Sequence, residues 1–161
     1  MTRMRVDQIT LREIGLPLKE PFRISSGEIR ERRIMLLELH DRSGASTWAE
    51  CVAGEAPNYS PETIDTAWPM TVQYVAPRVL GRTIDHPGDV HALLDDDFRG
   101  HNMAKAGVEM GMWGLSALMA GEPLSLFIGG TRAEIAVGIS LGIQASPERL
   151  VEKARAAIAE G

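Results

Sequence analysis

The sequence predicts an α+β fold in which three strands are followed by three helices, with one further strand and helix at the end of the chain. Three observations support this prediction. Apolar residues alternate with polar ones in the first 52 residues, recur at helical spacing between residues 60 and 120, and form a nearly continuous run at residues 135–143. An amphipathic helix follows this last run, as in the βα unit of a parallel sheet.

The predicted sheet is antiparallel. Its strands are expected at residues 5–18, 33–41 and 46–52. Ile9 and Leu11 share one face of the first strand, and the alternation changes phase at Ile14, which predicts a β-bulge. Turn-forming residues at 41–44 separate the second strand from the third and predict a hairpin.

Two helices are expected before residue 100. The first opens at Ser60 and Pro61 and ends at Gly81. Pro69 lies inside this helix and should kink it, because proline removes one backbone donor. A shorter helix is expected after Pro87.

The third helix, at residues 103–120, is apolar around most of its circumference, so it should be buried on most sides. Gly107, Gly111 and Gly114 each lower its helix propensity by roughly 1 kcal/mol, unless close packing against a neighbour compensates. One sheet can cover one side of this helix. We expect something else, outside this sheet, to cover the other side of the helix.

Residues 131–161 have the pattern of the first βα unit of something longer. Residues 135–143 suit a strand covered on both faces, Ser146 and Pro147 suit the start of a helix, and Gly161 suits its end. A parallel strand needs a parallel neighbour, and none follows in the sequence. We therefore expect residues 135–143 to seek another chain, through self-association or through a complementary segment.

Composition and charge exclude several functional classes. With 161 residues, 44% of them hydrophobic, the chain can bury a core, and a formal net charge of −5 argues against a nucleic-acid or membrane-surface partner. The sequence has neither a bilayer-spanning run nor the apolar core of a signal peptide. A single cysteine, Cys51, excludes an internal disulfide and fits a reducing compartment, so a cytoplasmic location is expected.

The residues alone do not predict a metal or nucleophile site. His86 and His91 are five positions apart and would diverge on a helix, so they do not form a paired metal site. The run Asp95, Asp96, Asp97 is typical of a solvated helix end. We therefore assign neither metal ligands nor catalytic residues to this chain.

Several blocks, taken in order, resemble the amino-terminal part of the enolase superfamily. They read PLKEPFRISSG, AECVAGEAPNYSPET, RGHNMAKAGVEMGMWGL, PLSLFIGGTR and VGISLGIQ. Within the superfamily the chain is most similar to the muconate-lactonising subgroup, in particular the N-succinylamino acid racemase and o-succinylbenzoate synthase family. The resemblance implies that residues 1–122 form an α+β capping domain, with a three-stranded antiparallel sheet and a helical bundle. Residues 123–161 would then be a linker and the first βα unit of an incomplete TIM-type barrel.

The chemistry implied by this resemblance is abstraction of a proton α to a carboxylate, with Mg²⁺ stabilising the enediolate and lysines as acid and base. The family's lysines and acidic metal ligands belong to later barrel strands, so the resemblance gives this chain no catalytic residue and no Mg²⁺ ligand. We expect this polypeptide alone to be inactive. Its expected partners are a small carboxylate substrate, the missing barrel segment or another chain, and further copies in a homo-oligomer. Dipeptide epimerisation, muconate cycloisomerisation and a non-catalytic interaction module remain alternatives.

Four residues match family positions near the substrate. Phe22 and Arg23 lie in a loop expected at residues 19–32, and an aromatic ring beside a guanidinium suits a succinylated ligand. Tyr59 matches a position near the pocket, although it could equally pack on the sheet. Ser140 matches a position whose side chain points into the barrel mouth, although a serine in a strand more often bonds neighbouring backbone.

Overall fold

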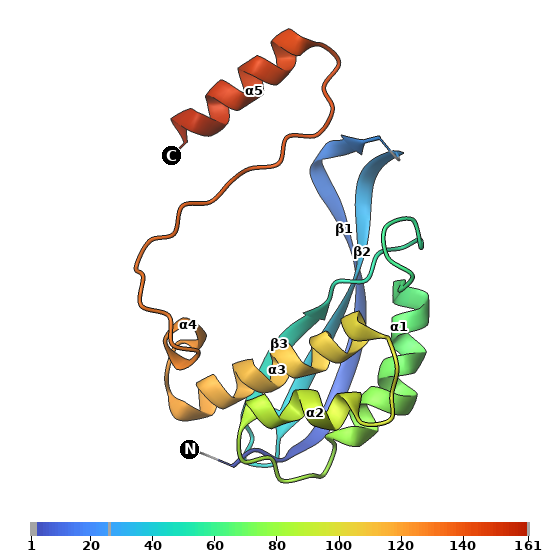
Figure 1. Cartoon of the computed structure of the whole chain (residues 1–161), viewed down its shortest axis with the longest axis vertical. Helices are drawn as coiled ribbons and strands as arrows, with labels where there is room; N and C mark the ends of the chain where they lie inside the picture. The colour runs from blue at the N-terminus through green and yellow to red at the C-terminus, as the bar shows by residue number, and fades with distance from the viewer. Residues whose placement is uncertain (1–2, 26, 161) are drawn as a thin grey trace. The chain divides into compact units, whose positions relative to one another are not determined.

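The computed structural model of the chain describes residues 3–25 and 27–160 (Figure 1). Packing divides the chain into two compact units. The first, which we call the body, comprises Met1–Gly15 and Arg33–Thr131, and the second unit comprises Leu16–Arg32 and Arg132–Gly161. The predicted functional division, at residues 122 and 123, stays a prediction.

The three predicted strands are confirmed, and two of them are longer than expected. They are β1 (Val6–Ile24), β2 (Gly27–Asp41) and β3 (Ser46–Cys51), in the order β1-β2-β3. β2 and β3 pair antiparallel, from Met35 opposite Cys51 to His40 opposite Ser46. The expected loop at residues 19–32 is wrong, because β1 continues to Ile24 and β2 begins at Gly27. The mixed charges of that stretch are compatible with a hairpin end exposed on both faces. Ser26, within this stretch, lies outside the described residues.

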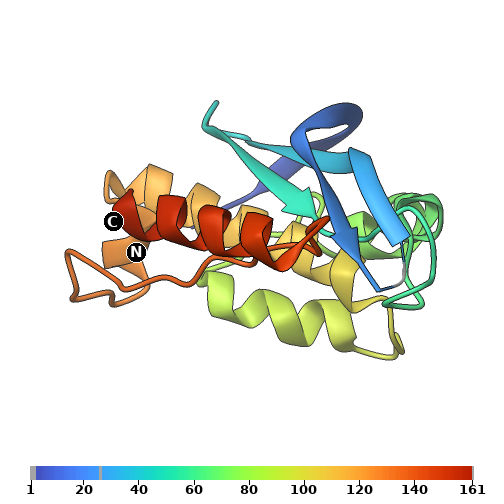
Figure 2. The ribbon, with the colours of Figure 1, turned by 90° about the horizontal axis from the view of Figure 1, so that it is seen from above.

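Helix α3 (Asn102–Ala120) packs against β2 and β3 through its glycines, and this close packing is the compensation that their low helix propensity requires. A Cβ on Gly111 would lie 2.6 Å from Leu39 Cδ1, and one on Gly107 would lie 3.2 Å from Leu37 Cδ1. α2 and α3 lie on one side of the three strands (Figure 2). The far side of α3 is only partly covered, since Met110 remains 46% exposed.

The first helix begins later than expected. α1 (Ile64–Met70) is capped by Thr63, whose hydroxyl accepts from the amide of Thr66 while the Thr66 side chain accepts from the amide of Thr63. This reciprocal cap explains why Ser60 and Pro61 stay outside the helix. Two residues after Pro69 the α-helix gives way to the π-helix η1 (Thr71–Val75), which is followed by η2 (Ala76–Arg78).

The remaining helices of the body are short. They are the single turn η3 (Pro87–Asp89), α2 (Val90–Asp95) and α4 (Leu124–Phe127). Together η3 and α2 confirm the helix expected after Pro87, and Val90 and Leu94 bury its inner face. In the described part of the chain, no helix has both the length and the apolarity required to cross a membrane.

The strand expected at residues 135–143 is wrong for this chain. This stretch has no strand structure, and Val137 and Ile139 are 88% and 69% exposed. A parallel strand is defined by hydrogen bonds to its neighbours, and the apolar pattern cannot supply them alone. The helix that follows is confirmed as α5 (Pro147–Ala159), with Ser146 accepting from the Arg149 amide at 3.4 Å. Gly161, its expected end, lies outside the described residues.

Candidate functional site

Phe22 and Arg23 lie at the far end of β1, in the second unit. Phe22 is half-buried, and the Arg23 side chain is 53% exposed. Arg23 donates from Nε and Nη2 to one oxygen of Glu28, at 3.1 and 2.7 Å. Arg30 donates to the other Glu28 oxygen at 2.6 Å. The carboxylate of Glu28 therefore lies between two guanidinium groups.

This arrangement leaves Arg23 able to bind an anion. The hydrogen bond from Arg23, with the charge of Arg30 beside it, holds the pKa of Glu28 below its ordinary value, so Glu28 stays ionised at neutral pH. Glu28 occupies the Nε–Nη2 edge of the Arg23 fork. None of the described residues bonds the edge formed by the two terminal nitrogens, and this edge can donate two parallel hydrogen bonds to a ligand carboxylate.

The backbone after Ser140 contacts the same end of β1. The Ile143 amide donates to the Arg23 carbonyl oxygen at 2.7 Å. Ser140 itself is exposed and precedes this contact by three residues. The second unit thus brings Phe22 and Arg23 together with the segment that carries Ser140.

Tyr59 belongs to the body and lies in the segment between β3 and α1. Its side chain is 97% exposed, so the alternative in which it packs on the sheet is wrong. Its phenol is free to meet a ligand, and its role near a pocket stays a prediction.

Three residues of this region were not predicted from the sequence: Glu28, Gly142 and Lys153. Glu28 was one of several mixed charges, and nothing in the sequence singles it out as the partner of Arg23. Lys153 of α5 pairs with Glu20 of β1 across 133 positions of sequence. Only the fold reveals contacts of that kind.

The acidic run beside α2 is more than a solvated face, because one of its members is tied into the body. Lys105 is buried on α3 and donates to Asp95 at 2.7 Å and to the Phe98 carbonyl at 2.5 Å. Lys105 lowers the pKa of Asp95. The bonds fix the chain between α2 and α3. An open depression of about 630 Å³ nearby includes Asp85, Asp89 and Asp96 in its lining, a charge unsuited to a carboxylate ligand.

The residues present do not fit a magnesium site. Within residues 3–25 and 27–160, no group of three or more His, Cys, Asp or Glu side chains could hold a metal ion. Cys51, the one cysteine, is buried, and burial raises the pKa of its thiol. We therefore derive no step of a reaction through a metal or a thiolate of this chain.

Comparisons with known proteins match nearly the whole chain to one superfamily. The family model for the mandelate racemase / muconate lactonizing enzyme N-terminal domain matches residues 7–129. The o-succinylbenzoate synthase of Geobacillus stearothermophilus is 37% identical over 158 residues, which are 98% of this chain and 42% of that protein. The N-succinylamino acid racemase of Thermus thermophilus is 40% identical over 153 residues, 93% of this chain and 41% of that protein.

Solved structures agree with these matches. An enolase-superfamily member from Listeria innocua superposes with a TM-score of 0.90 at 30% sequence identity, covering 98% of this chain and 42% of that one. The chain thus spans about 42% of the length of the curated relatives and solved structures that it matches.

Proposed function

The chain belongs to the family of mandelate racemase / muconate lactonizing enzyme N-terminal domains, and from this premise we propose that it forms the substrate-capping part of an enzyme that abstracts a proton α to a carboxylate. The predicted membership of the enolase superfamily is confirmed by the family match and by the relatives. The predicted fold class is confirmed as well, since the three-stranded sheet and its helices match the capping domain of that superfamily.

Within this class the reaction is racemisation of N-succinylamino acids, synthesis of o-succinylbenzoate, or both. The names of relatives that are 37% and 40% identical support this choice. The observation that carries it in this chain is the guanidinium of Arg23. Glu28 binds only its Nε–Nη2 edge, and the edge formed by the two terminal nitrogens fits a ligand that ends in a carboxylate, as a succinyl group does.

In this proposal the residues of the chain bind and orient the substrate, and they do not transfer its proton. Arg23 binds the succinyl carboxylate, Phe22 packs against the linker, and Tyr59 and Ser140 line the site. Proton transfer and Mg²⁺ binding belong to the rest of the complete enzyme, because the described residues offer no metal site. Alone, this polypeptide is inactive.

Further features of the complete enzyme follow from the same proposal. A barrel segment, or another chain, covers residues 135–143, whose apolar side chains are exposed here. The enzyme is a cytoplasmic homo-oligomer, and the single free cysteine agrees with a reducing compartment. Dipeptide epimerisation and muconate cycloisomerisation are the alternative reactions, and a binding module without chemistry is the alternative function.

A chimera tests the proposal. Residues 1–161 replace the aligned part of the Geobacillus stearothermophilus o-succinylbenzoate synthase, and exchange of the α-proton in D₂O with Mg²⁺ is followed by NMR. We expect exchange of N-succinylamino acids by the chimera and none by residues 1–161 alone. Exchange by the isolated chain would overturn its predicted inactivity. A folded chimera that prefers dipeptides or muconate would support the alternative reactions.

Arg23→Ala in the chimera tests the site itself. We expect kcat/KM for N-succinyl substrates to fall about ten- to a hundredfold, the value of a charge-assisted hydrogen bond, with little change for N-acetyl substrates. N-acetyl substrates lack the second carboxylate and serve as the matched control. An equal loss for both substrates would contradict the role given to Arg23.

A further inference from the structure

The backbone at residues 142 and 143 lies unusually close to the end of β1. A Cβ on Gly142 would lie 3.0 Å from the Arg23 carbonyl oxygen, 3.2 Å from the Arg23 nitrogen and 3.2 Å from Phe22 Cδ2. Two of these three atoms belong to the backbone, which cannot rotate away as a side chain can. A Cβ at position 142 would displace this backbone by a few tenths of an ångström, so the approach, and the hydrogen bond from Ile143 to Arg23 beside it, favour glycine there.

We propose that Gly142 is a positioning residue for substrate recognition, because the absence of a side chain lets residues 142–143 fix the backbone of Phe22 and Arg23. The inference rests on the proposed function, in which these two residues meet the substrate. Gly142 acts through them and does not touch the ligand.

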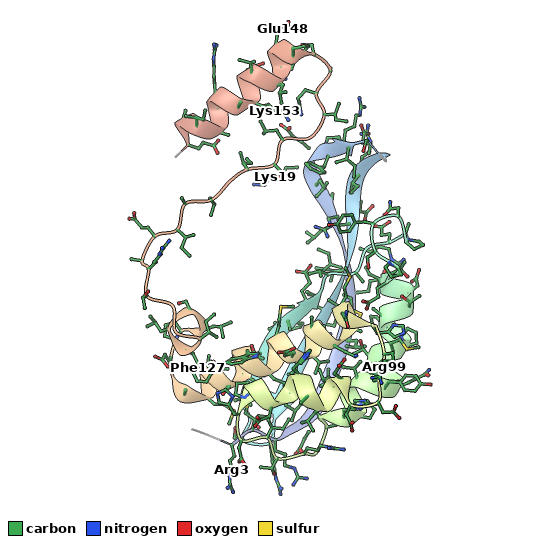
Figure 3. The ribbon with its side chains drawn as sticks, in the orientation of Figure 1. Arg3, Lys19, Arg99, Phe127, Glu148 and Lys153 are labelled. Carbon is green, nitrogen blue, oxygen red and sulfur yellow. The ribbon has the colours of Figure 1, made fainter. Side chains whose placement is uncertain are left out.

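Two further contacts hold the joint between residues 142–143 and β1. The Gln144 side chain donates to the Gly142 carbonyl at 2.7 Å, a local hydrogen bond that restrains the backbone of this segment. Lys153 of α5, labelled in Figure 3, pairs with Glu20, three residues before Arg23. The hydrogen bond from Lys153 lowers the pKa of Glu20, so Glu20 is ionised at neutral pH. Both groups are partly exposed, so this ion pair is the weaker anchor.

The joint and Glu28 hold different parts of Arg23. Ile143 binds its carbonyl oxygen at 2.7 Å, and Glu28 binds the Nε–Nη2 edge of its guanidinium. With both ends held, the free edge of the guanidinium keeps one direction before a ligand arrives. Such preorganisation raises affinity, because less conformational freedom is lost on binding.

The same segment offers a matched control. Gly138 lies four residues before Gly142, and a Cβ placed on it would meet no atom within 4 Å. Gly142→Val and Gly138→Val therefore make the same chemical change in the same irregular stretch. Only the first should disturb the joint.

The test uses residues 1–161 and needs no activity. We expect Gly142→Val to raise hydrogen exchange of the amides at residues 22–24, and trypsin cleavage after Arg23, by about tenfold, because a clash of this size shifts an opening equilibrium by about that factor. Gly138→Val should leave both rates unchanged. Lys153→Met should raise them only two- to threefold, by roughly the value of an exposed ion pair.

Folding of the variants is checked at helix α3. Exchange of its amides should be the same in all variants, since it belongs to the body. If the Val variant fails to fold, Gly142→Ala, a smaller change at the same position, takes its place. It should raise exchange at residues 22–24 by less than tenfold. Equal exchange at residues 22–24 in the Gly142 and Gly138 variants would overturn the proposal that Gly142 fixes the backbone of Phe22 and Arg23.

The chimera separates failure of the joint from failure of the proposed function. We expect Gly142→Val to raise KM for an N-succinylamino acid about tenfold with kcat nearly unchanged, while Gly138→Val alters neither. Faster exchange at residues 22–24 with an unchanged KM would show that the joint exists but does not position a substrate-binding residue. A chimera without any exchange of N-succinyl substrates would instead contradict the proposed function and leave the exchange data on the joint intact.

Discussion

The body and the second unit have similar apolar patterns and opposite burial. Leu37 and Leu39 of β2 are fully buried, whereas Val137 and Ile139, at the same alternate spacing, are 88% and 69% exposed. Every described residue that is buried belongs to the body. An apolar pattern therefore shows which face an element can bury, and a neighbouring element decides whether that face is buried.

The two regions should differ most in free energy of unfolding when a large aliphatic side chain is removed from each. Leu39 touches the helix that covers the sheet, since a Cβ on Gly111 would lie within 2.6 Å of it. We expect Leu39→Ala to lower the free energy of unfolding by about 2–5 kcal/mol, because it removes buried surface and leaves a cavity. Ile139→Ala should change it by less than about 0.5 kcal/mol.

Urea denaturation followed by far-UV circular dichroism measures both variants. The m-value of Ile139→Ala should match that of the parent, because its side chain buries little surface in this chain. A loss of stability in Ile139→Ala as large as that in Leu39→Ala would mean that residues 135–143 are packed in solution. That result would contradict the contrast between the two regions.

Helix caps offer a second way to compare the regions. Glu62 is 9% exposed and accepts from the amides of Met103 and Ala104, at 2.9 and 3.2 Å, at the start of α3. Ser146 accepts from Arg149 at 3.4 Å, at the start of α5, which has no buried residue. Glu62→Ala should cost about 1–3 kcal/mol of global stability, because buried amides lose their acceptor.

Ser146→Ala is the matched variant for Glu62→Ala. It should fray α5 and leave the denaturation midpoint of the body unchanged, since a helix without buried residues contributes little to global unfolding. Hydrogen exchange of the first turn of each helix distinguishes the two effects. A shift of the midpoint by Ser146→Ala would show that α5 unfolds together with the body.

Much of the body could be predicted from the sequence, because its signals are local. Alternation placed all three strands, and the apolar circumference of residues 103–120 placed α3 to within one residue. The start of α1 was missed by three residues. The cap between Thr63 and Thr66 uses two threonine side chains, and Ser60 and Pro61 offered an equally plausible helix start in the sequence.

The candidate site was harder to predict, because its contacts join distant positions. Phe22 and Arg23 were found through family resemblance, and the predicted loop around them is a hairpin end. The bond from Ile143 to Arg23 and the pair of Lys153 with Glu20 span more than a hundred residues, so no local pattern signals them. The roles of Tyr59 and Ser140 stay predictions.

The smallest expected effect concerns two carboxylates whose pKa is lowered, Asp41 in the body and Glu20 in the second unit. Asp41 is 7% exposed, and burial alone would raise its pKa, but hydrogen bonds from Ser43 and Arg5 outweigh burial and lower it. A carboxyl whose pKa is depressed in the folded state stabilises the fold above its unfolded pKa, and that stability is lost as the pH falls through the folded value. Asp41→Asn should therefore cost about 1 kcal/mol above pH 5, and the difference from the parent should shrink below about pH 4. Glu20→Gln should leave global stability unchanged at every pH, because the pair of Glu20 with Lys153 is exposed and lies in the unit whose described residues are all exposed or half-buried. Urea midpoints measured from pH 2.5 to 7 test both expectations, and a constant deficit for Asp41→Asn across that range would refute the charge of Asp41 as its cause.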